Sequence, residues 1–408
     1  MTSPFATLLL QVAVVLAVAH ATGSLFRRLR QPRVMGEMAG GILLGPSLLG
    51  WLAPRLQAAL FPPDSLDRFD ALSGLGLILF MFLVGTQVDL GHLRGRAARS
   101  VVLISHSGIV VPFALGALLA FLLYPALSLP EVRRLHFTLF MGTAMSITAF
   151  PVLARMLTEE GLVRTRLGAI ALACAAVDDV TAWCLLAAVV MLVRSSETTT
   201  PIWATLLGAA AYLALMLAGA RRLLRRLVPP GRIDAPMVRT TLALALLVML
   251  LSAWATEQLG IHAIFGAFLA GAVMPKEKQF TQALSDRLED TSVVLLLPLF
   301  FASAGLRTSI ALISGSKLWL VLLLLIATAI AGKVGGAMLA ARATGFSWRD
   351  AAALGALMNT RGLMELVALK VGLEVGVISQ PVFTMMVLMA LVTTLMTVPL
   401  LRWMGPVS

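Results

Sequence analysis

The sequence predicts an all-α membrane protein with 13 transmembrane helices, and three observations support this fold class. Hydrophobic residues make up 59% of the chain and charged residues only 13%, whereas a soluble domain would carry about a quarter charged residues. Apolar runs of roughly 20 residues recur between short charged connectors, which is the length that a helix needs to cross a bilayer. The ten-residue alternation typical of a membrane β-barrel is absent.

Each apolar run predicts one helix, and the odd number of runs places the two ends of the chain on opposite sides of the membrane. No basic residue precedes Arg27, so we expect the first run to be a retained helix rather than a cleaved signal peptide. The predicted spans lie near residues 5–25, 34–51, 71–88, 99–124, 135–156, 166–193, 202–220, 238–256, 261–275, 291–306, 317–341, 349–371 and 378–402.

The distribution of positive charge predicts the orientation. With the N-terminus outside, cytoplasmic ends carry 22 of the 32 Lys and Arg residues and external ends carry 7. The positive-inside rule therefore places the C-terminus in the cytoplasm. We expect the membrane to be the inner membrane of a bacterium. The net charge of +12 is then explained by contact with the anionic lipid bilayer and not by nucleic acid. Six residues follow Arg402, so we expect no regulatory domain after the last span.

An internal similarity suggests an inverted repeat. The spans 71–88 and 291–306 both end in an aromatic-rich stretch that closes on a glycine, Gly85 or Gly305. Equivalent helices are seven positions apart in the order of predicted helices. Because seven is odd, equivalent helices cross the membrane in opposite directions, so the two halves have opposite orientations. Such repeats are typical of secondary transporters, whose substrate site lies at the midplane between the halves.

An aspartate pair, Asp178 and Asp179, lies about 12 residues into the span 166–193, near the bilayer centre. Charged side chains at this depth are costly and mark functional sites. Two adjacent carboxylates cannot both stay ionised there without a cation, a proton or a basic partner. A proton and an alkali cation exclude each other at one carboxylate, and this competition suffices for exchange. The alternative is a structural pair satisfied by Ser, Thr or Arg side chains.

Lys333, in the span 317–341, is the candidate charge-compensating partner for this pair. The alternative is a side chain that extends to the cytoplasmic surface.

Two spans carry signals of a break. Pro151 removes an intrahelical hydrogen bond, so the helix is expected to open there, and the freed carbonyls with the Ser146 and Thr148 hydroxyls would supply oxygen ligands for an alkali cation. A simple proline kink is the alternative.

The second break is expected around Asn359, Thr360 and Gly362. Arg361 would compensate carbonyls at a helix end, with Glu365 as its partner one turn later. Structural charge compensation is favoured here over direct contact with the ion.

Other function classes fit less well. No His, Cys or Asp cluster has transition-metal spacing and no phosphate-binding loop is present, so we expect no cofactor and no use of ATP. The only metal expected is an alkali cation at Asp179. An intramembrane aspartyl protease needs aspartates on facing helices, whereas these point about 100° apart on one helix, so no enzyme is predicted. A passive cation channel and a sodium-coupled organic-anion symporter remain as alternatives.

Four strings, which lie along nearly the whole chain, resemble the monovalent cation:proton antiporter-2 family. This family includes bacterial sodium/proton antiporters, potassium-efflux antiporters and plant cation/proton exchangers. The strings are AMSITAFPVLAR at 144–155, AVDDVTAW at 176–183, IHAIFGAF at 261–268 and NTRG at 359–362.

The resemblance implies the sodium/proton antiporter fold, with two crossed broken helices and an elevator mechanism. By motif match, Asp179 corresponds to the ion- and proton-binding aspartate and Asp178 to the residue before it, and Lys333 corresponds to the lysine that pairs with Asp178. A dimeric scaffold is also implied. The implied domains are scaffold helices at 1–98 and 226–316, core helices at 99–193 and 317–408, and a linker helix at 194–225.

The match leaves the transported ion open. Plant exchangers usually have asparagine before the aspartate and the potassium-efflux group often has glutamine. This chain has Asp-Asp, as in the electrogenic sodium/proton branch, although its 144–155 string is closest to the plant type. The expected function is proton-driven Na⁺ export, with K⁺ as the alternative ion.

Overall fold

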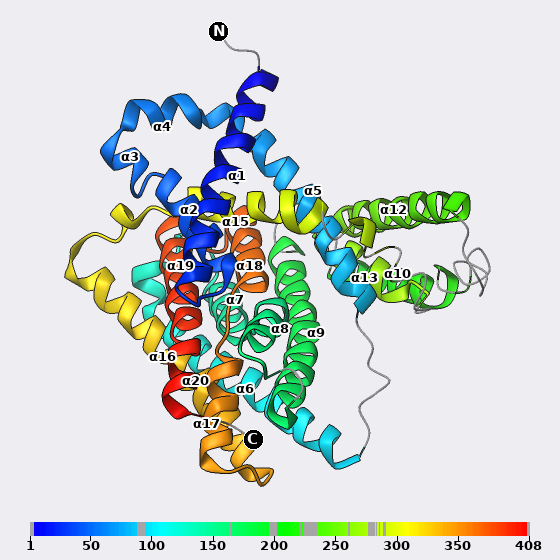
Figure 1. Ribbon diagram of the computed structural model, residues 1–408, viewed down its shortest axis with the longest axis vertical. Helices are drawn as coiled ribbons and strands as arrows, with labels where there is room; N and C mark the ends of the chain where they lie inside the picture. The colour runs from blue at the N-terminus through cyan, green and yellow to red at the C-terminus, as the bar shows by residue number, and fades with distance from the viewer. Residues whose placement is uncertain are drawn as a thin grey trace. The chain divides into compact units, whose positions relative to one another are not determined.

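A computed structural model shows an all-helical chain (Figure 1). It describes residues 4–87, 95–162, 165–195, 202–220, 222, 235–259, 262–275, 282, 284, 286–288 and 291–405. Every regular element within these residues is a helix, which agrees with the predicted all-α class.

Eight stretches of these helices are long and apolar enough to cross a membrane. They correspond to eight of the predicted spans, so the chain is a multi-pass membrane protein. The stretches are Pro4–Arg28, Asp64–Thr86, Arg99–Leu127, Arg166–Arg194, Thr240–Gln258, Val294–Leu312, Gly315–Ala343 and Gln380–Met404.

The other five predicted spans coincide with shorter or divided helices, so the number 13 stays a prediction. The prediction of one helix over 34–51 was wrong. Helix α2 (Arg33–Leu44) ends within this range, and two short helices, α3 (Leu49–Leu52) and α4 (Pro54–Leu60), follow it. The reason is Pro46, which disfavours helical backbone in the residue before it. Gly45 accordingly has an extended conformation, with φ −81° and ψ −170°.

The chain forms two compact units. The first contains residues 1–12, 63–90 and 190–300, and the second contains residues 13–62, 91–189 and 301–408. Helices of the first unit include α5 (Pro63–Gln87), α10 (Ile202–Ala214), a π-helical turn at Leu215–Ala220, α12 (Ala235–Gln258), α13 (Ala263–Val273) and a π-helical turn at Thr291–Leu296.

Close backbone contact joins α5 to α13 within the first unit. A β-carbon at Gly85 would overlap the carbonyl oxygen of Phe268, and one at Gly271 would overlap the carbonyl oxygen of Phe82. Small residues at such crossings let transmembrane helices approach and gain van der Waals contact. The two glycines therefore set the distance between these helices.

Gly85→Ala is expected to destabilise the protein by about 1–3 kcal/mol, because the added methyl group pushes against backbone and not against a movable side chain. Gly74→Ala is the matched control on the same helix, since no atom of the described residues lies within 4 Å of a β-carbon there. Alanine is the better helix former, so the control should melt at or above the wild-type temperature. Thermal melting in detergent compares the two, and equal melting temperatures would contradict the close contact.

The second unit contains the broken helices. Its elements include α6 (Gly95–Leu127), α7 (Arg134–Ser146), α8 (Phe150–Glu159), α16 (Gly315–Ala343), α17 (Trp348–Met358), α18 (Leu363–Glu374), α19 (Gln380–Leu395) and α20 (Thr397–Met404). Most of α9 (Arg166–Ser195) and of α15 (Leu297–Leu306) also belongs to it. One buried apolar cluster holds α6, α8, α9, α16 and α17 together.

Two glycines bring α16 against α6. A β-carbon at Gly332 would lie 2.7 Å from the α-carbon of Pro112, and one at Gly336 would lie 2.8 Å from the carbonyl oxygen of Ser107. Lys333 stands between these glycines, so the close approach carries its side chain toward α6 and into the interior of the unit.

Candidate functional site

The two broken helices meet at their breaks. Helix α7 ends at Ser146 and α8 begins at Phe150, while α17 ends at Met358 and α18 begins at Leu363. The backbone N–H of Ala149 donates to the carbonyl oxygen of Thr360 at 3.0 Å. The two non-helical segments are thus hydrogen-bonded to each other.

The first break lies at residues 147–149, just ahead of Pro151. Ile147 has extended backbone, with φ −70° and ψ 137°. Pro151 is the second residue of α8, where a helix has no intrahelical acceptor for the N–H that proline lacks. The proline therefore starts the second half-helix, and the opening that we predicted at Pro151 lies slightly before it.

The Asp178 carboxylate is fully hydrogen-bonded. Its Oδ1 accepts from Ser105 Oγ at 2.5 Å, and its Oδ2 accepts from Thr148 Oγ1 at 2.8 Å and from Lys333 Nζ at 3.0 Å. Both side chains of the Asp178–Lys333 ion pair are 0% exposed. A buried ion pair is tolerated only when further hydrogen bonds satisfy the remaining polar atoms, and this one has them.

Lys333 completes its hydrogen bonding at backbone carbonyls. Its Nζ donates to Gly108 O at 2.7 Å and to Ser146 O at 2.6 Å. Three acceptors match the three donors of an ammonium group. The side chain therefore points into the protein, which rules out the alternative of extension to the cytoplasmic surface.

Asp179 has spare acceptor capacity. Its side chain is buried, and its Oδ1 accepts from the backbone N–H of Phe150 at 3.4 Å. Its Oδ2 has no hydrogen-bond partner among the described residues. A buried carboxylate oxygen without a partner is costly unless a proton or a cation occupies it. Of the two aspartates, Asp179 is the one that remains available.

The first residue of α8 thus points its N–H at Asp179. Unpaired N–H groups at a helix start carry partial positive charge, which favours an anion there. Asp179 is therefore held at the positive end of the half-helix that the break exposes.

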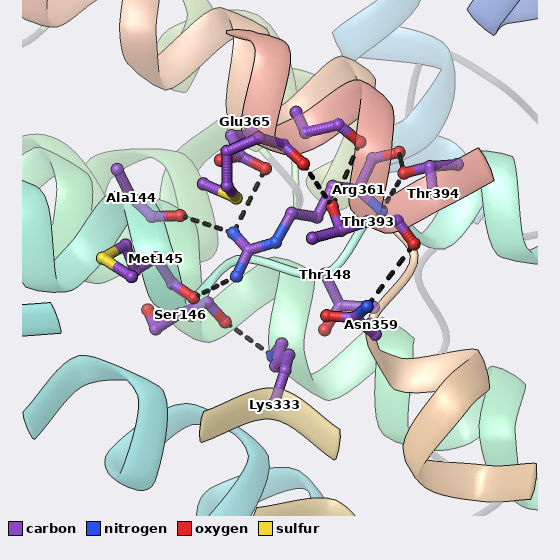
Figure 2. Close-up of polar contacts among 12 residues, drawn as sticks. Ala144, Met145, Ser146, Thr148, Lys333, Asn359, Arg361, Glu365, Thr393 and Thr394 are labelled. Carbon is purple, nitrogen blue, oxygen red and sulfur yellow. Dashed lines mark hydrogen bonds and ion pairs between the residues drawn. The ribbon is translucent and has the colours of Figure 1, made fainter. Parts of the chain in front are cut away.

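Arg361 compensates the partial negative charge on the other side of this break, at the C-terminal end of α7. Its Nη1 donates to Ala144 O at 3.2 Å and its Nη2 donates to Met145 O at 2.7 Å (Figure 2). Nη1 also contacts Glu365 Oε2 at 3.2 Å, and both side chains are 0% exposed. Because Lys333 binds Ser146 O, two cations cap the last three carbonyls of α7, where a helix carries partial negative charge.

Threonines of α19 hold the second break in place. The backbone N–H of Arg361 donates to Thr394 Oγ1 at 2.8 Å, and this hydroxyl donates in turn to Arg361 O at 2.7 Å (Figure 2). Asn359 Nδ2 donates to Thr393 O at 3.4 Å. The open backbone at the break is therefore satisfied by a neighbouring helix, as membrane interiors require.

Further buried oxygens line the breaks. Asn359 Oδ1, Thr360 Oγ1 and Glu365 Oε1 have no hydrogen-bond partner in the part of the chain that the structure describes. The Ser146 hydroxyl instead donates to Thr143 O at 2.7 Å along its own helix, and Thr148 Oγ1 is engaged with Asp178 and with Met358 O. The remaining predicted break residue, Gly362, has an extended φ of 164° directly before α18.

The sequence analysis did not single out Ser105, Thr393 or Thr394. Small hydroxyl residues are common in transmembrane helices, where they bond to carbonyls of their own helix, so their type and spacing carry no distinct signal.

Comparisons with known proteins agree on one family. A model described as "Sodium/hydrogen exchanger, transmembrane" matches residues 13–403. The chain is 42% identical to the Na⁺/H⁺ antiporter NhaS4 of Synechocystis over 98% of this chain and 97% of that protein. It is 42% identical to Cation/H⁺ antiporter 17 of Arabidopsis thaliana and 34% identical to K⁺/H⁺ antiporter 1 of Saccharomyces cerevisiae.

These two alignments cover 96% and 100% of this chain but 48% and 47% of the plant and yeast proteins. The chain thus spans about half the length of these relatives. Among solved structures, the sodium proton antiporter MjNhaP1 of Methanocaldococcus jannaschii has a TM-score of 0.69 at 15% identity, over 98% of each chain. At this identity the likeness concerns the fold.

Proposed function

Because the chain belongs to the sodium/hydrogen exchanger family, we propose that it is a secondary antiporter that exchanges protons for Na⁺ or K⁺ at Asp179. The relatives described above are named as Na⁺/H⁺, cation/H⁺ and K⁺/H⁺ antiporters and not as enzymes. The observation that carries the proposal is the buried Asp179 carboxylate, which has one oxygen without a partner in the described chain.

Exchange follows from competition at this carboxylate. With the proton bound, Asp179 is neutral and its unpaired oxygen is satisfied by its own O–H. With the proton released, the carboxylate attracts an alkali cation, whose remaining ligands are oxygens at the two breaks. Asn359 Oδ1 and Thr360 Oγ1 supply such oxygens without giving up a described hydrogen bond. Hard oxygen donors suit a dehydrated alkali ion.

The neighbouring charges keep the rest of the site neutral. Asp178 is matched by Lys333, and Glu365 by Arg361. A proton or a cation at Asp179 therefore neutralises the one carboxylate of the site that has no basic partner among the described residues. We assign Asp178 and Thr148 to positioning Lys333 at the end of α7, and the other break residues to keeping the half-helices open.

We place this site in a chain that crosses a bacterial inner membrane 13 times, with the N-terminus outside the cell and the C-terminus in the cytoplasm. The core helices at 99–193 and 317–408 move as an elevator against the scaffold at 1–98 and 226–316, through the linker at 194–225. A homodimer formed by the scaffold gives the moving core a fixed frame. Na⁺ is the first candidate ion and K⁺ the second. Both ions are named among the relatives.

Proteoliposomes with a trapped pH dye and an acidic interior test the proposal. External Na⁺, and more weakly K⁺, is expected to raise the internal pH, because inward cation movement is coupled to outward proton movement. Choline is the control, since the methyl groups around its charged nitrogen keep oxygen ligands away from the charge. Folded protein that responds to no alkali cation at any pH would contradict the antiporter. Cation flux that ignores the pH gradient would indicate a channel.

A further inference from the structure

A cavity of about 700 Å³ lies in the second unit, away from the aspartates. It is lined by the beginnings of α6 and α9 and by the end of α16, with Arg99 and Arg166 on two of its walls. The guanidinium of Arg166 stacks on the ring of Phe346, with 5.1 Å between the guanidinium carbon and the ring centroid, and this contact orients it.

The charge of this cavity is unbalanced. No acidic side chain is among its described lining residues. Arg99 and Arg166 are exposed, and neither forms an ion pair with a described carboxylate. Two guanidinium groups that face one cavity without a described acidic partner favour an anionic occupant, and their planar donor geometry suits a phosphate group.

The cavity lies at the ends of three apolar helices. Three apolar spans begin or end at its lining residues, namely Arg99–Leu127, Arg166–Arg194 and Gly315–Ala343. Leu103 and Ile170 also line it, each four residues beyond one of the arginines and therefore about 6 Å farther along its helix. The cavity is thus basic at its outer end and apolar toward the membrane interior.

We propose that this cavity binds an anionic phospholipid, with its phosphate between Arg99 and Arg166 and an acyl chain along Leu103 and Ile170. A free phosphate or a small phosphate ester would use the basic end alone and leave the apolar end empty. The charge count places this end of the helices on the cytoplasmic side, where anionic lipids attract Lys and Arg.

The lipid would act on the helices that hold the ion-pair network. Ser105 on α6, Asp178 on α9 and Lys333 on α16 meet in the interior. Arg99, Arg166 and Ala343 lie on the same three helices at their outer ends. A headgroup bound there joins these ends, so its occupancy stabilises the helix packing on which the network depends.

Thermal melting and native mass spectrometry of delipidated protein, with added phosphatidylglycerol or phosphatidylcholine, test this site without a transport assay. Phosphatidylglycerol is expected to raise the melting temperature of the wild type, with phosphatidylcholine giving little effect. In the double variant Arg99→Gln, Arg166→Gln its apparent affinity should fall about thirtyfold, from two charges near the surface. The matched control is Arg27→Gln, Arg28→Gln, which removes two exposed charges at the end of α1 (Pro4–Arg28).

A second variant covers the case in which the double variant does not fold. Leu103→Glu keeps both arginines, and its carboxylate lies one turn from Arg99, where the two charges neutralise each other. It should weaken the phosphatidylglycerol response as well. Equal loss in the Arg27, Arg28 control, a wild-type response in Leu103→Glu, or equal stabilisation by glycerol 3-phosphate would each overturn the phospholipid site.

Discussion

Asp179→Asn is expected to reduce cation-driven proton movement in proteoliposomes by at least about a hundredfold, which corresponds to the loss of one charged ligand and of the titrating group. The amide keeps an oxygen that accepts from the Phe150 N–H, as Asp179 Oδ1 does. It binds no proton at physiological pH and offers no negative charge to a cation. The measurement is the initial rate of internal pH change after Na⁺ addition.

Stability distinguishes this role from a structural one. Because Asp179 Oδ2 has no partner within the described residues, removing its charge should leave the melting temperature unchanged or raise it. Added Na⁺ should protect wild-type protein against melting and should not protect Asp179→Asn, because a ligand stabilises only the state that binds it.

Asp67→Asn is the matched control for this variant, since it removes the same charge from an exposed position on α5. It should transport and melt like the wild type. If Asp179→Asn retained wild-type exchange, the site would have to be sought elsewhere, with Glu365 and its unpaired Oε1 as the next carboxylate to change.

The charged residues of this site were predictable from the sequence because burial of charge in a membrane is costly enough to be rare. Both Lys333 and Arg361 are fully buried, and the structure adds what they do there, which is to cap three carbonyls of α7. Which aspartate is satisfied by Lys333 depends on the rotation of α9, so residue type alone does not separate Asp178 from Asp179. The resemblance implied that Lys333 pairs with Asp178, and the structure contains this ion pair.

Backbone detail was less predictable than charge. Pro151 signalled a break, but a proline fits the first turn of a helix, so the opening lies before it. Gly45-Pro46 carried the same kind of signal within the range 34–51, and its apolar surroundings masked the end of α2. Ser105 and Thr394 act through single hydroxyls, and nothing in residue type marks which hydroxyl of a helix faces a partner.

Arg361→Gln is expected to be the most destabilising single change among the residues named here, at about 3–5 kcal/mol. It leaves Glu365 as a buried charge without its partner, and it removes the guanidinium donors from Ala144 O and Met145 O. Arg28→Gln is the control for loss of an arginine at an exposed position. Thermal melting in detergent is the measurement, and equal melting of the two variants would contradict the capping role.

The double variant Arg361→Gln, Glu365→Gln separates the two causes of this loss. Replacing Glu365 in the Arg361→Gln background removes the uncompensated charge, so the double variant should be more stable than Arg361→Gln alone. It should still fall short of the wild type, because Met145 O loses the guanidinium donor, and a buried carbonyl left without a donor costs about 1–3 kcal/mol. Complete rescue would mean that Arg361 serves only to neutralise Glu365, and no rescue would mean that it serves only to cap α7. Partial rescue is the expected result because the guanidinium does both, which a lysine with one nitrogen could not do at the same geometry.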